Sequence, residues 1–215
     1  MHHVHVPTHP FITDALAQCR DKSTPTPQFR AAVASLGRWL AYEACRDWLP
    51  TLQTRVETPL DVEADAVVID RTSRVEIVPI LRAGLALVEG VLPLLPDAQI
   101  LHVGYRRDQE TARAVCYLTG LPEQMPDGGR YLILEPMLAT GGTLIQALDA
   151  MTARGADVGL IRVLSLIASQ PALDKIGEKY PEVTIFCAAV DAEIDERFFI
   201  VPGLGDAGDR AFGTE

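Results

Sequence analysis

From residue 75 onward, apolar residues gather in short runs that alternate with longer, helix-length patterns. Several of the short runs are apolar almost throughout, which is typical of parallel strands buried on both faces. The expected strands are Val75–Leu81, Gln99–Gly104, Tyr131–Glu135, Gly159–Ile167 and Val183–Val190. The expected helices are Pro27–Trp48, Gly84–Leu95, Gly142–Arg154 and Gln170–Lys179. The resulting order β-α-β-β-α-β-α-β predicts an open α/β domain with an N-terminal helical region laid against it.

Polar, proline-containing segments interrupt this pattern twice, at Asp21–Pro27 and at Pro122–Arg130, and both are expected to be loops. Between two strands, Arg106–Gly120 has no clean helical period, and we interpret it as a hairpin or a mobile arm. Ligands of open α/β sheets bind at the carboxyl ends of the strands. Residues with a chemical role are therefore expected directly after the strands.

The strongest chemical signal follows one of these strands, in the segment YLILEPMLATGGT. The strand ends in the acid Glu135, and a turn of small residues, Ala139–Thr143, opens the next helix. Glycine amides at a helix N-terminus can cradle an anion, and the hydroxyls of Thr140 and Thr143 add donors. Glu135 cannot bind phosphate, so its expected partners are sugar hydroxyls or a metal. A tight β–α turn in which threonine caps the helix without any ligand is the open alternative.

Composition narrows the class of protein. A length of 215 residues suits one domain, and 48% hydrophobic with 22% charged residues is typical of a globular chain. The formal net charge of −10 argues against broad nucleic-acid binding and against docking on anionic membranes. No apolar stretch is long enough for a membrane helix and no secretory signal is visible, so a cytoplasmic protein is expected. The four cysteines form no CxxC pair and are expected to be free thiols.

Two segments carry a family resemblance. EPMLATGGT, residues Glu135–Thr143, resembles the phosphoribosyl pyrophosphate (PRPP) motif of type I phosphoribosyltransferases, in the form found in uracil phosphoribosyltransferases. That form begins Asp-Pro, so Glu135 is a departure by one methylene. The tail IVPGLGDAGDRAFGTE resembles the C-terminal signature of the same family. Its G-x-G-x-x-G, Gly203–Gly208, lacks the helix and distant acid that a dinucleotide-binding fingerprint requires.

Further agreement lies in Val78–Gly84, which matches the family's pyrophosphate-contacting segment, and in Gly104–Thr111, where Arg106 replaces the usual tyrosine. The resemblance implies a type I phosphoribosyltransferase-like fold: an open parallel sheet flanked by helices, in one domain over residues 1–215. Residues 1–60 would form an N-terminal helical extension, 106–130 an arm or lid, and 191–215 a base-binding tail.

The resemblance also implies the reaction of uracil with PRPP to give UMP and pyrophosphate, with Arg107 and Asp206 as catalytic residues. The implied PRPP-binding residues are Arg82, Arg107, Glu135, Pro136, Met137, Leu138, Ala139, Thr140, Gly141, Gly142, Thr143 and Asp206. The implied uracil-binding residues are Ile200, Gly205, Asp206 and Ala207. Mg²⁺ would be held mainly by PRPP, without a direct protein ligand. A homodimer or tetramer is expected, and a GTP effector is left open.

Two departures keep alternatives open. The family usually has Gly-Tyr where this chain has Phe198-Phe199, which points to a phosphoribosyltransferase for another base as one alternative. Glu135 suggests a non-catalytic module that senses PRPP or a nucleotide as the other. The histidines at 2, 3, 5 and 9 are interpreted as a flexible tail rather than a metal site. Asp191–Arg197 is expected to be a solvated loop.

Overall fold

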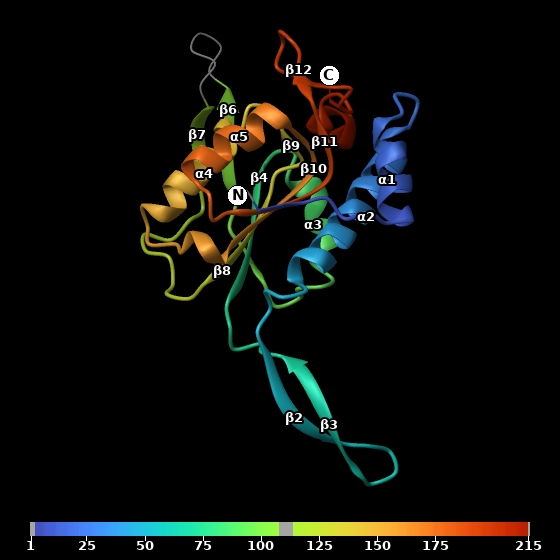
Figure 1. The fold of residues 1–215 in the computed structure, drawn as a ribbon, viewed down its shortest axis with the longest axis vertical. Coiled ribbons are helices and arrows are strands. Elements are labelled where there is room, and N and C mark those ends of the chain that lie inside the picture. Colours follow the sequence, from blue (N-terminus) through green and yellow to red (C-terminus); the bar gives the residue numbers. More distant parts are fainter. Residues whose placement is uncertain (1–2, 108–113, 215) are drawn as a thin grey trace.

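The computed structural model describes residues 3–107 and 114–214 and contains a central, mostly parallel sheet (Figure 1). In this part of the chain the strand order is β1-β11-β10-β8-β4-β6-β7, and of these neighbouring pairs only β6 and β7 are antiparallel. The strands are β1 (His3–His5), β4 (Val75–Leu81), β6 (Val103–Arg107), β7 (Ala114–Thr119), β8 (Arg130–Leu134), β10 (Ile161–Ser169) and β11 (Thr184–Asp191). Two short strands extend the sheet: β5 (Gln99–Ile100) beside β4 and β9 (Met137–Leu138) beside β10. The open parallel sheet predicted from the sequence is confirmed.

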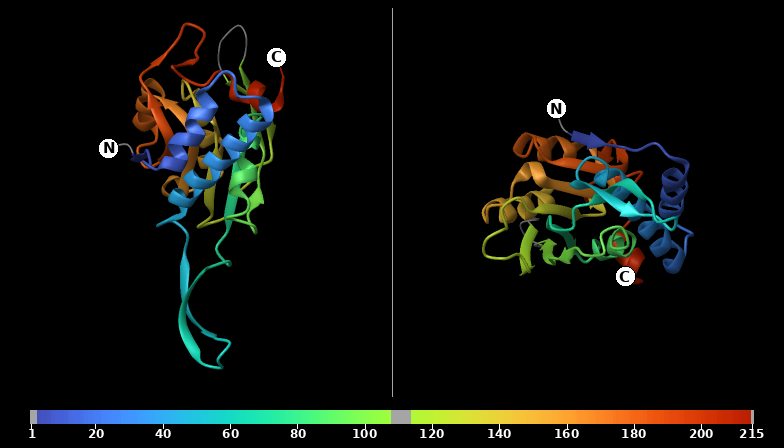
Figure 2. Two further views of the ribbon diagram at one scale, coloured as in Figure 1. Left: turned by 90° about the vertical axis from the view of Figure 1, so that its right-hand side faces the viewer. Right: turned by 90° about the horizontal axis from the view of Figure 1, so that it is seen from below.

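Helices cover both faces of this sheet (Figures 1 and 2). One face carries α1 (Pro10–Arg20), α2 (Thr26–Cys45) and α3 (Leu85–Val91), with the short α6 (Ala207–Phe212) against α2. The other face carries α4 (Gly142–Thr152) and α5 (Gln170–Lys179), and a 3-10 turn at Val158–Leu160 leads into β10. Within the described ranges, no helix has the length and apolar character needed to cross a membrane.

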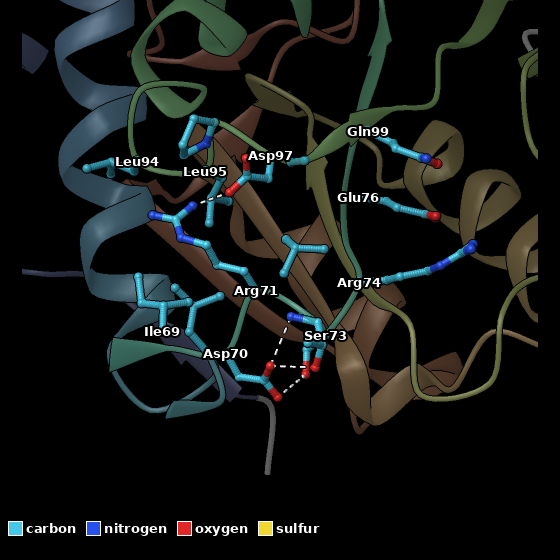
Figure 3. A pocket seen from close by; sticks show the side chains of 15 residues that line it. Ile69, Asp70, Arg71, Ser73, Arg74, Glu76, Leu94, Leu95, Asp97 and Gln99 are labelled. Atoms are coloured by element: carbon cyan, nitrogen blue, oxygen red, sulfur yellow. Dashed lines mark hydrogen bonds and ion pairs between the residues drawn. The ribbon is translucent and has the colours of Figure 1, made fainter. Parts of the chain in front are cut away.

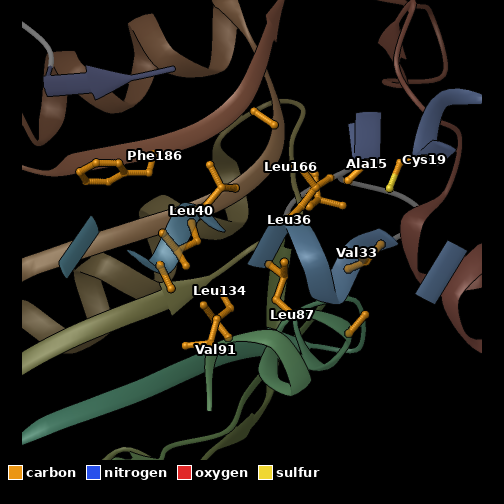
Figure 4. Close-up of a cluster of buried hydrophobic side chains, with 14 of the residues drawn as sticks. Ala15, Cys19, Val33, Leu36, Leu40, Leu87, Val91, Leu134, Leu166 and Phe186 are labelled. Atoms are coloured by element: carbon orange, nitrogen blue, oxygen red, sulfur yellow. The ribbon is translucent and has the colours of Figure 1, made fainter. Parts of the chain in front are cut away.

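The core on the α2 and α3 face is built from leucine and valine side chains of both helices packed against the sheet (Figure 4). Leu36 and Leu40 of α2 and Leu87 and Val91 of α3 are all fully buried, as is Leu134 of β8. Burial of each such side chain contributes about 1.5–3 kcal/mol relative to leaving it in water.

Close approach of α2 and α3 depends on Gly90. A Cβ atom built at that position would lie 1.8 Å from the carbonyl oxygen of Ala34, which is a backbone atom and cannot rotate away. A side chain of any size therefore forces the two helices apart.

The N-terminal third differs from the sequence prediction, because the helical extension expected over residues 1–60 ends at Cys45. Residues 51–69 form an antiparallel hairpin of β2 (Thr51–Glu57) and β3 (Glu63–Ile69), which projects from the end of the body opposite the carboxyl ends of the strands (Figures 1 and 2). In β2, Leu52, Thr54 and Val56 alternate with polar residues, and this period of two favours a strand over a helix. A turn closes the hairpin, with Asp61 in the left-handed region at φ +56°.

The histidine segment is not a flexible tail in its described part. His3–His5 form β1, which pairs in parallel with β11 at the edge of the sheet. The ring of His5 stacks on Phe186 with centroids 4.7 Å apart. The flexible-tail interpretation was wrong because pairing with a distant strand gives these residues a fixed place. His2 lies outside the described residues.

The predicted arm is a hairpin where it is described. β6 and β7 pair from Val103 with Thr119 to Arg107 with Ala114, while residues 108–113 lie outside the described residues. The arm does not extend to residue 130. Met125 is buried and its amide donates to the carbonyl of Arg154 at 2.8 Å, so the segment that follows Gly120 packs on the body.

Substitution of Gly90 by alanine is expected to lower the free energy of unfolding by about 1–3 kcal/mol, because the added methyl group overlaps the Ala34 carbonyl. Urea denaturation followed by circular dichroism measures the change. Gly159→Ala is the matched control, because a Cβ atom there meets its nearest neighbour, Asp157, at an ordinary 3.4 Å. Equal stability of the two variants would contradict the close-approach argument.

Candidate active site

Three adjacent strands deliver charged residues to one edge of the sheet. Arg107 ends β6, Arg82 directly follows β4, and Glu135 directly follows β8. Because β8, β4 and β6 are neighbours and parallel, their carboxyl ends meet at the upper end of the molecule in Figure 1. The residues predicted to contact PRPP from these strands are therefore brought to a common edge.

The turn Ala139–Thr143 lies at the N-terminus of α4, as predicted. Gly141 is left-handed at φ +70°, and a Cβ there would lie 3.1 Å from both the Ala172 carbonyl oxygen and the Ile176 side chain. The Ser169 hydroxyl donates to the carbonyl of Ala139 at 2.6 Å and accepts from the amide of Ala172 at 3.0 Å. These contacts hold the turn against α5. The first amide of α4, that of Gly142, donates to the Thr140 hydroxyl at 3.5 Å, a long hydrogen bond that an anion at the helix N-terminus could replace.

The side chains of this segment divide into two groups. Met137 and Ala139 face a cavity, whereas Leu138 is 1% exposed and belongs to the core beneath α4, and Pro136 is also buried. The carbonyl of Pro136 accepts hydrogen bonds from the Leu166 amide at 2.9 Å and the Ser165 hydroxyl at 3.1 Å. Pro136 and Leu138, predicted as PRPP contacts, therefore support the turn and do not present their side chains to a ligand.

Glu135 is a half-buried acid, one of whose carboxylate oxygens is buried and lacks a hydrogen-bond partner. Its amide donates to the carbonyl of Leu164 at 3.0 Å, but its Oε2 is buried and unpartnered. Burial raises the pKa of Glu135 to about 8, because the charged form is separated from water. The carboxyl group is therefore mostly protonated at pH 7 in the ligand-free protein, and a hydroxyl donor would satisfy its free oxygen.

The tail residues predicted to bind a base line the same cavity as Met137 and Ala139. Its volume is about 400 Å³. The lining residues are Ala83, Met137, Ala139, Arg197, Phe198, Phe199, Ile200, Gly205, Asp206, Ala207 and Gly208. The cavity thus joins the residue after Arg82, the PRPP-like turn and the C-terminal tail. Segments more than 50 residues apart in the sequence therefore form one site.

Asp206 and Arg82 have partners in the tail helix. Asp206 caps α6 by accepting a hydrogen bond from the amide of Asp209 at 2.9 Å. The guanidinium of Arg82 lies 3.2 Å from the carboxylate of Asp209. Asp209, which no sequence pattern singled out, therefore ties Arg82 to the tail helix α6.

The comparisons with known proteins decide the family. The family model described as uracil phosphoribosyltransferase matches residues 6–214. The uracil phosphoribosyltransferase of Synechococcus elongatus is 53% identical over 211 residues, which is 98% of this chain and 97% of that protein.

The chain belongs to the uracil phosphoribosyltransferase family.

Solved structures share the fold of this chain. The AQ2163 protein of Aquifex aeolicus has a TM-score of 0.87 and 34% identity, covering 97% of each chain. The orotate phosphoribosyltransferase of Mycobacterium tuberculosis in complex with PRPP has a TM-score of 0.51 and 14% identity, covering 88% of this chain and 97% of that one. The second likeness shows the type I phosphoribosyltransferase fold alone.

Where this chain departs from the family's usual Gly-Tyr, its backbone retains a conformation that favours glycine. Phe198 has φ +67°, and its side chain and that of Phe199 both line the cavity. Arg197 stacks over the ring of Phe199 at 5.4 Å. Two phenylalanines and one arginine therefore form one wall of the site in this member of the uracil phosphoribosyltransferase family.

A second cavity lies at the other end of β4 and is separate from this site (Figure 3). It has a volume of about 140 Å³ and lies between the segments 69–76 and 94–99, where Arg71 pairs with Asp97. Because Val75 begins β4 and Arg82 follows its end, the length of the strand separates the two cavities.

The free energy of unfolding of the ligand-free protein is expected to fall, relative to that of Glu135→Gln, as the pH rises from about 5 to about 8. The folded-state pKa of about 8 exceeds the ordinary 4.5, so in this range the folded protein holds a proton that the unfolded chain has released. Raising the pH therefore lowers the free energy of unfolding, relative to that of Glu135→Gln, by up to about 1.4 kcal/mol per pH unit. Urea titrations across this range measure the difference.

Glu178→Gln, which changes an exposed glutamate, is the control for this measurement and should follow the wild type at each pH. If the free energies of unfolding of the wild type and Glu135→Gln differ by the same amount at every pH in this range, the Glu135 carboxyl is ionised throughout it.

Proposed function

We propose that this protein transfers the phosphoribosyl group of PRPP to uracil, giving UMP and pyrophosphate. The observation that carries the proposal is the cavity in which Met137 and Ala139, where the chain enters the turn before α4, face the tail. The turn suits a phosphorylated sugar and the tail suits a base. The names of its relatives support the same reaction. The four cysteines are free thiols, which fits the reducing cytoplasm.

The chemistry requires stabilisation of a leaving polyanion. The bond from the anomeric carbon to pyrophosphate breaks while uracil N1 forms a new bond to that carbon and loses its proton. Positive charge develops on the ribose and negative charge on the pyrophosphate, so fixed cations beside the leaving group lower the barrier. We assign this role to Arg82 and Arg107, which the parallel strands β4 and β6 bring to one edge.

Binding of the sugar falls to the turn and to Glu135. The amides of Gly141 and Gly142, with the hydroxyls of Thr140 and Thr143, would hold the 5-phosphate at the N-terminus of α4. The unpartnered Oε2 of Glu135 would accept a hydrogen bond from a ribose hydroxyl. Such a bond also favours the ionised form of the carboxyl, so binding of the sugar and release of the Glu135 proton are coupled.

Recognition of uracil falls to backbone groups of the tail. Uracil offers two carbonyl acceptors and an N3–H donor, and Ile200 with Gly205–Ala207 would supply complementary groups along the cavity wall. Among the described lining residues, Asp206 is the carboxylate. We assign to it the catalytic role on the base side of the site, receiving the proton that N1 loses.

Mg²⁺ is proposed to enter with PRPP. The cation would be held mainly by substrate oxygens and water, without a direct protein ligand. When bound, the ion would neutralise charge on the departing pyrophosphate.

We also propose that a second copy of this chain covers the β2–β3 hairpin. The hairpin has two unlike faces. Arg55 forms ion pairs with Glu63 and Asp65 on one face, whereas the other face carries small and apolar side chains, and the larger of these are exposed. That apolar face consists of Leu52, Thr54, Val56, Ala64, Ala66 and Val68.

A two-stranded hairpin is marginally stable on its own, and one that extends away from the body (Figure 2) has no helix beside it. An equivalent hairpin face from a second copy matches this surface in apolar character and length. We therefore propose a homodimer in which the two hairpins take part.

The protein is expected to form UMP from uracil and PRPP in the presence of Mg²⁺, and to use cytosine roughly 10⁴-fold less efficiently in kcat/KM, because cytosine leaves buried groups unpaired. Initial rates with uracil, cytosine, hypoxanthine and adenine test this. Turnover of a different base would favour a phosphoribosyltransferase with another base preference. Tight PRPP binding without any product would favour a sensing module.

Val68→Lys is expected to convert the dimer to a monomer, since it places a charge on the apolar face of the hairpin. Sedimentation equilibrium at micromolar concentration measures the change. Val67→Lys is a closely matched control, because Val67 is the neighbouring residue, is exposed and lies on the charged face. A wild-type protein that is already monomeric, or equal effects of both variants, would refute the proposed interface.

A further inference from the structure

One loop of the tail, residues 202–206, has a backbone conformation that its own residues do not fix. Residues 202–206 form no helix or strand, and Gly203 and Gly205 are left-handed at φ +62° and +76°. A Cβ at Gly203 would lie 2.0 Å from the carbonyl oxygen of Ile200, so this turn is very tight. Glycine gives such a loop many alternative conformations, and contacts from outside must select one.

Those contacts come from an ion pair between distant parts of the chain. Arg20, the last residue of α1, donates to both carboxylate oxygens of Asp191 at the end of β11, at 2.7 and 2.9 Å. The same guanidinium donates to the carbonyl of Gly203 at 2.8 Å, and Asp191 accepts from the amide of Gly203 at 3.0 Å. The pair therefore binds both backbone polar groups of Gly203.

Asp191 is suited to this role by its surroundings. It is 7% exposed, so it is not the solvated residue expected from the sequence. Burial opposes its ionisation, but the hydrogen bonds from Arg20 and Gly203 outweigh that effect and hold the pKa of Asp191 below its usual range. A fully hydrogen-bonded, charged acid in a bidentate pair has a narrowly defined position.

A second arginine holds the next residue of the loop. Arg210 of α6 donates to the carbonyl of Leu204 at 2.7 Å and to the carbonyls of Cys19 and Asp21 at the end of α1. Its guanidinium stacks over the ring of Phe29 at 4.2 Å. The loop is thus tied at Gly203 and Leu204 to one point, the C-terminal end of α1.

None of these charged residues is among the residues that line the base cavity, whereas Gly205–Ala207 follow the tied residues directly and do line it. We propose that Arg20 and Asp191 are positioning residues for uracil, which hold Gly203 so that the amides of Gly205–Ala207 meet the base edge. The inference rests on the proposed function and assigns to that site a support outside the cavity. A misplacement of about 1 Å in such groups can cost a hundredfold in rate.

Arg20→Lys and Asp191→Asn test the proposal. Lysine keeps the charge but cannot bind both carboxylate oxygens and the Gly203 carbonyl in the same geometry. Asparagine keeps the size but loses the charge. Both variants are expected to raise KM for uracil by about tenfold or more and to reduce the preference for uracil over cytosine, with KM for PRPP within about twofold of the wild type. KM for PRPP is expected to change little because the turn before α4 does not contact Arg20, Asp191 or Gly203.

Arg46→Lys is the matched control, since Arg46 forms a bidentate pair with Glu43 in an exposed position remote from the tail. It should leave both KM values unchanged. Parallel changes in the two KM values of Arg20→Lys, or no change in either, would overturn the positioning role.

Amide hydrogen exchange of the ligand-free protein provides a readout that does not need turnover. Arg20→Lys is expected to speed exchange at residues 203–207 by about tenfold or more while β4 and β8 exchange as in the wild type. If the wild type forms no UMP, the proposed function fails, and this measurement still decides whether Arg20 holds the loop. Unchanged exchange at residues 203–207 would refute the inference. If Asp191→Asn does not fold, Arg20→Lys still gives both measurements.

Discussion

Burial of both faces of the parallel sheet is the constraint on which the rest of the structure depends. β4 and β10 are buried along nearly their whole length, so charged groups that take part in chemistry can lie only where these strands end. Because parallel strands share one direction, their ends coincide, and Arg107, Arg82 and Glu135 meet at one edge although they are spread over more than 50 residues of sequence. The helices on both faces make the burial possible, and Gly90 allows two of them to pack closely.

The net charge of the whole chain and the local charge of the proposed site act on PRPP in opposite directions. The chain carries a formal charge of −10, which at long range opposes a polyanion such as PRPP. The proposed site counters this locally with Arg82, Arg107 and the amides of the turn before α4. Glu135 fits the same logic, because burial raises its pKa to about 8 and removes a negative charge from the ligand-free site at neutral pH.

Patterns that repeat locally were enough to predict most of the sheet, the helices that flank it and the turn at Ala139–Thr143. Features that depend on contacts between residues far apart in the sequence could not be predicted. β1 forms because His3–His5 pair with a strand some 180 residues away, and the β2–β3 hairpin carries its apolar face in solvent, so burial within one chain does not reveal it. Asp191 appeared to belong to a polar loop because its partner, Arg20, lies 171 positions away. The motif residues could be named from sequence, but the groups that hold the tail could not.

The tie between Arg20 and Asp191 also bears on the order in which the molecule assembles. It closes a loop of 171 residues, and contacts of such separation form late, since their entropy cost is offset only after the intervening sheet has gathered. The turn before α4 needs only its neighbouring strand and helix and can form earlier. The half of the pocket proposed to recognise the base is therefore expected to form after the half proposed to hold the sugar phosphate. Partly unfolded molecules should then lose discrimination between bases before they lose the phosphate cradle.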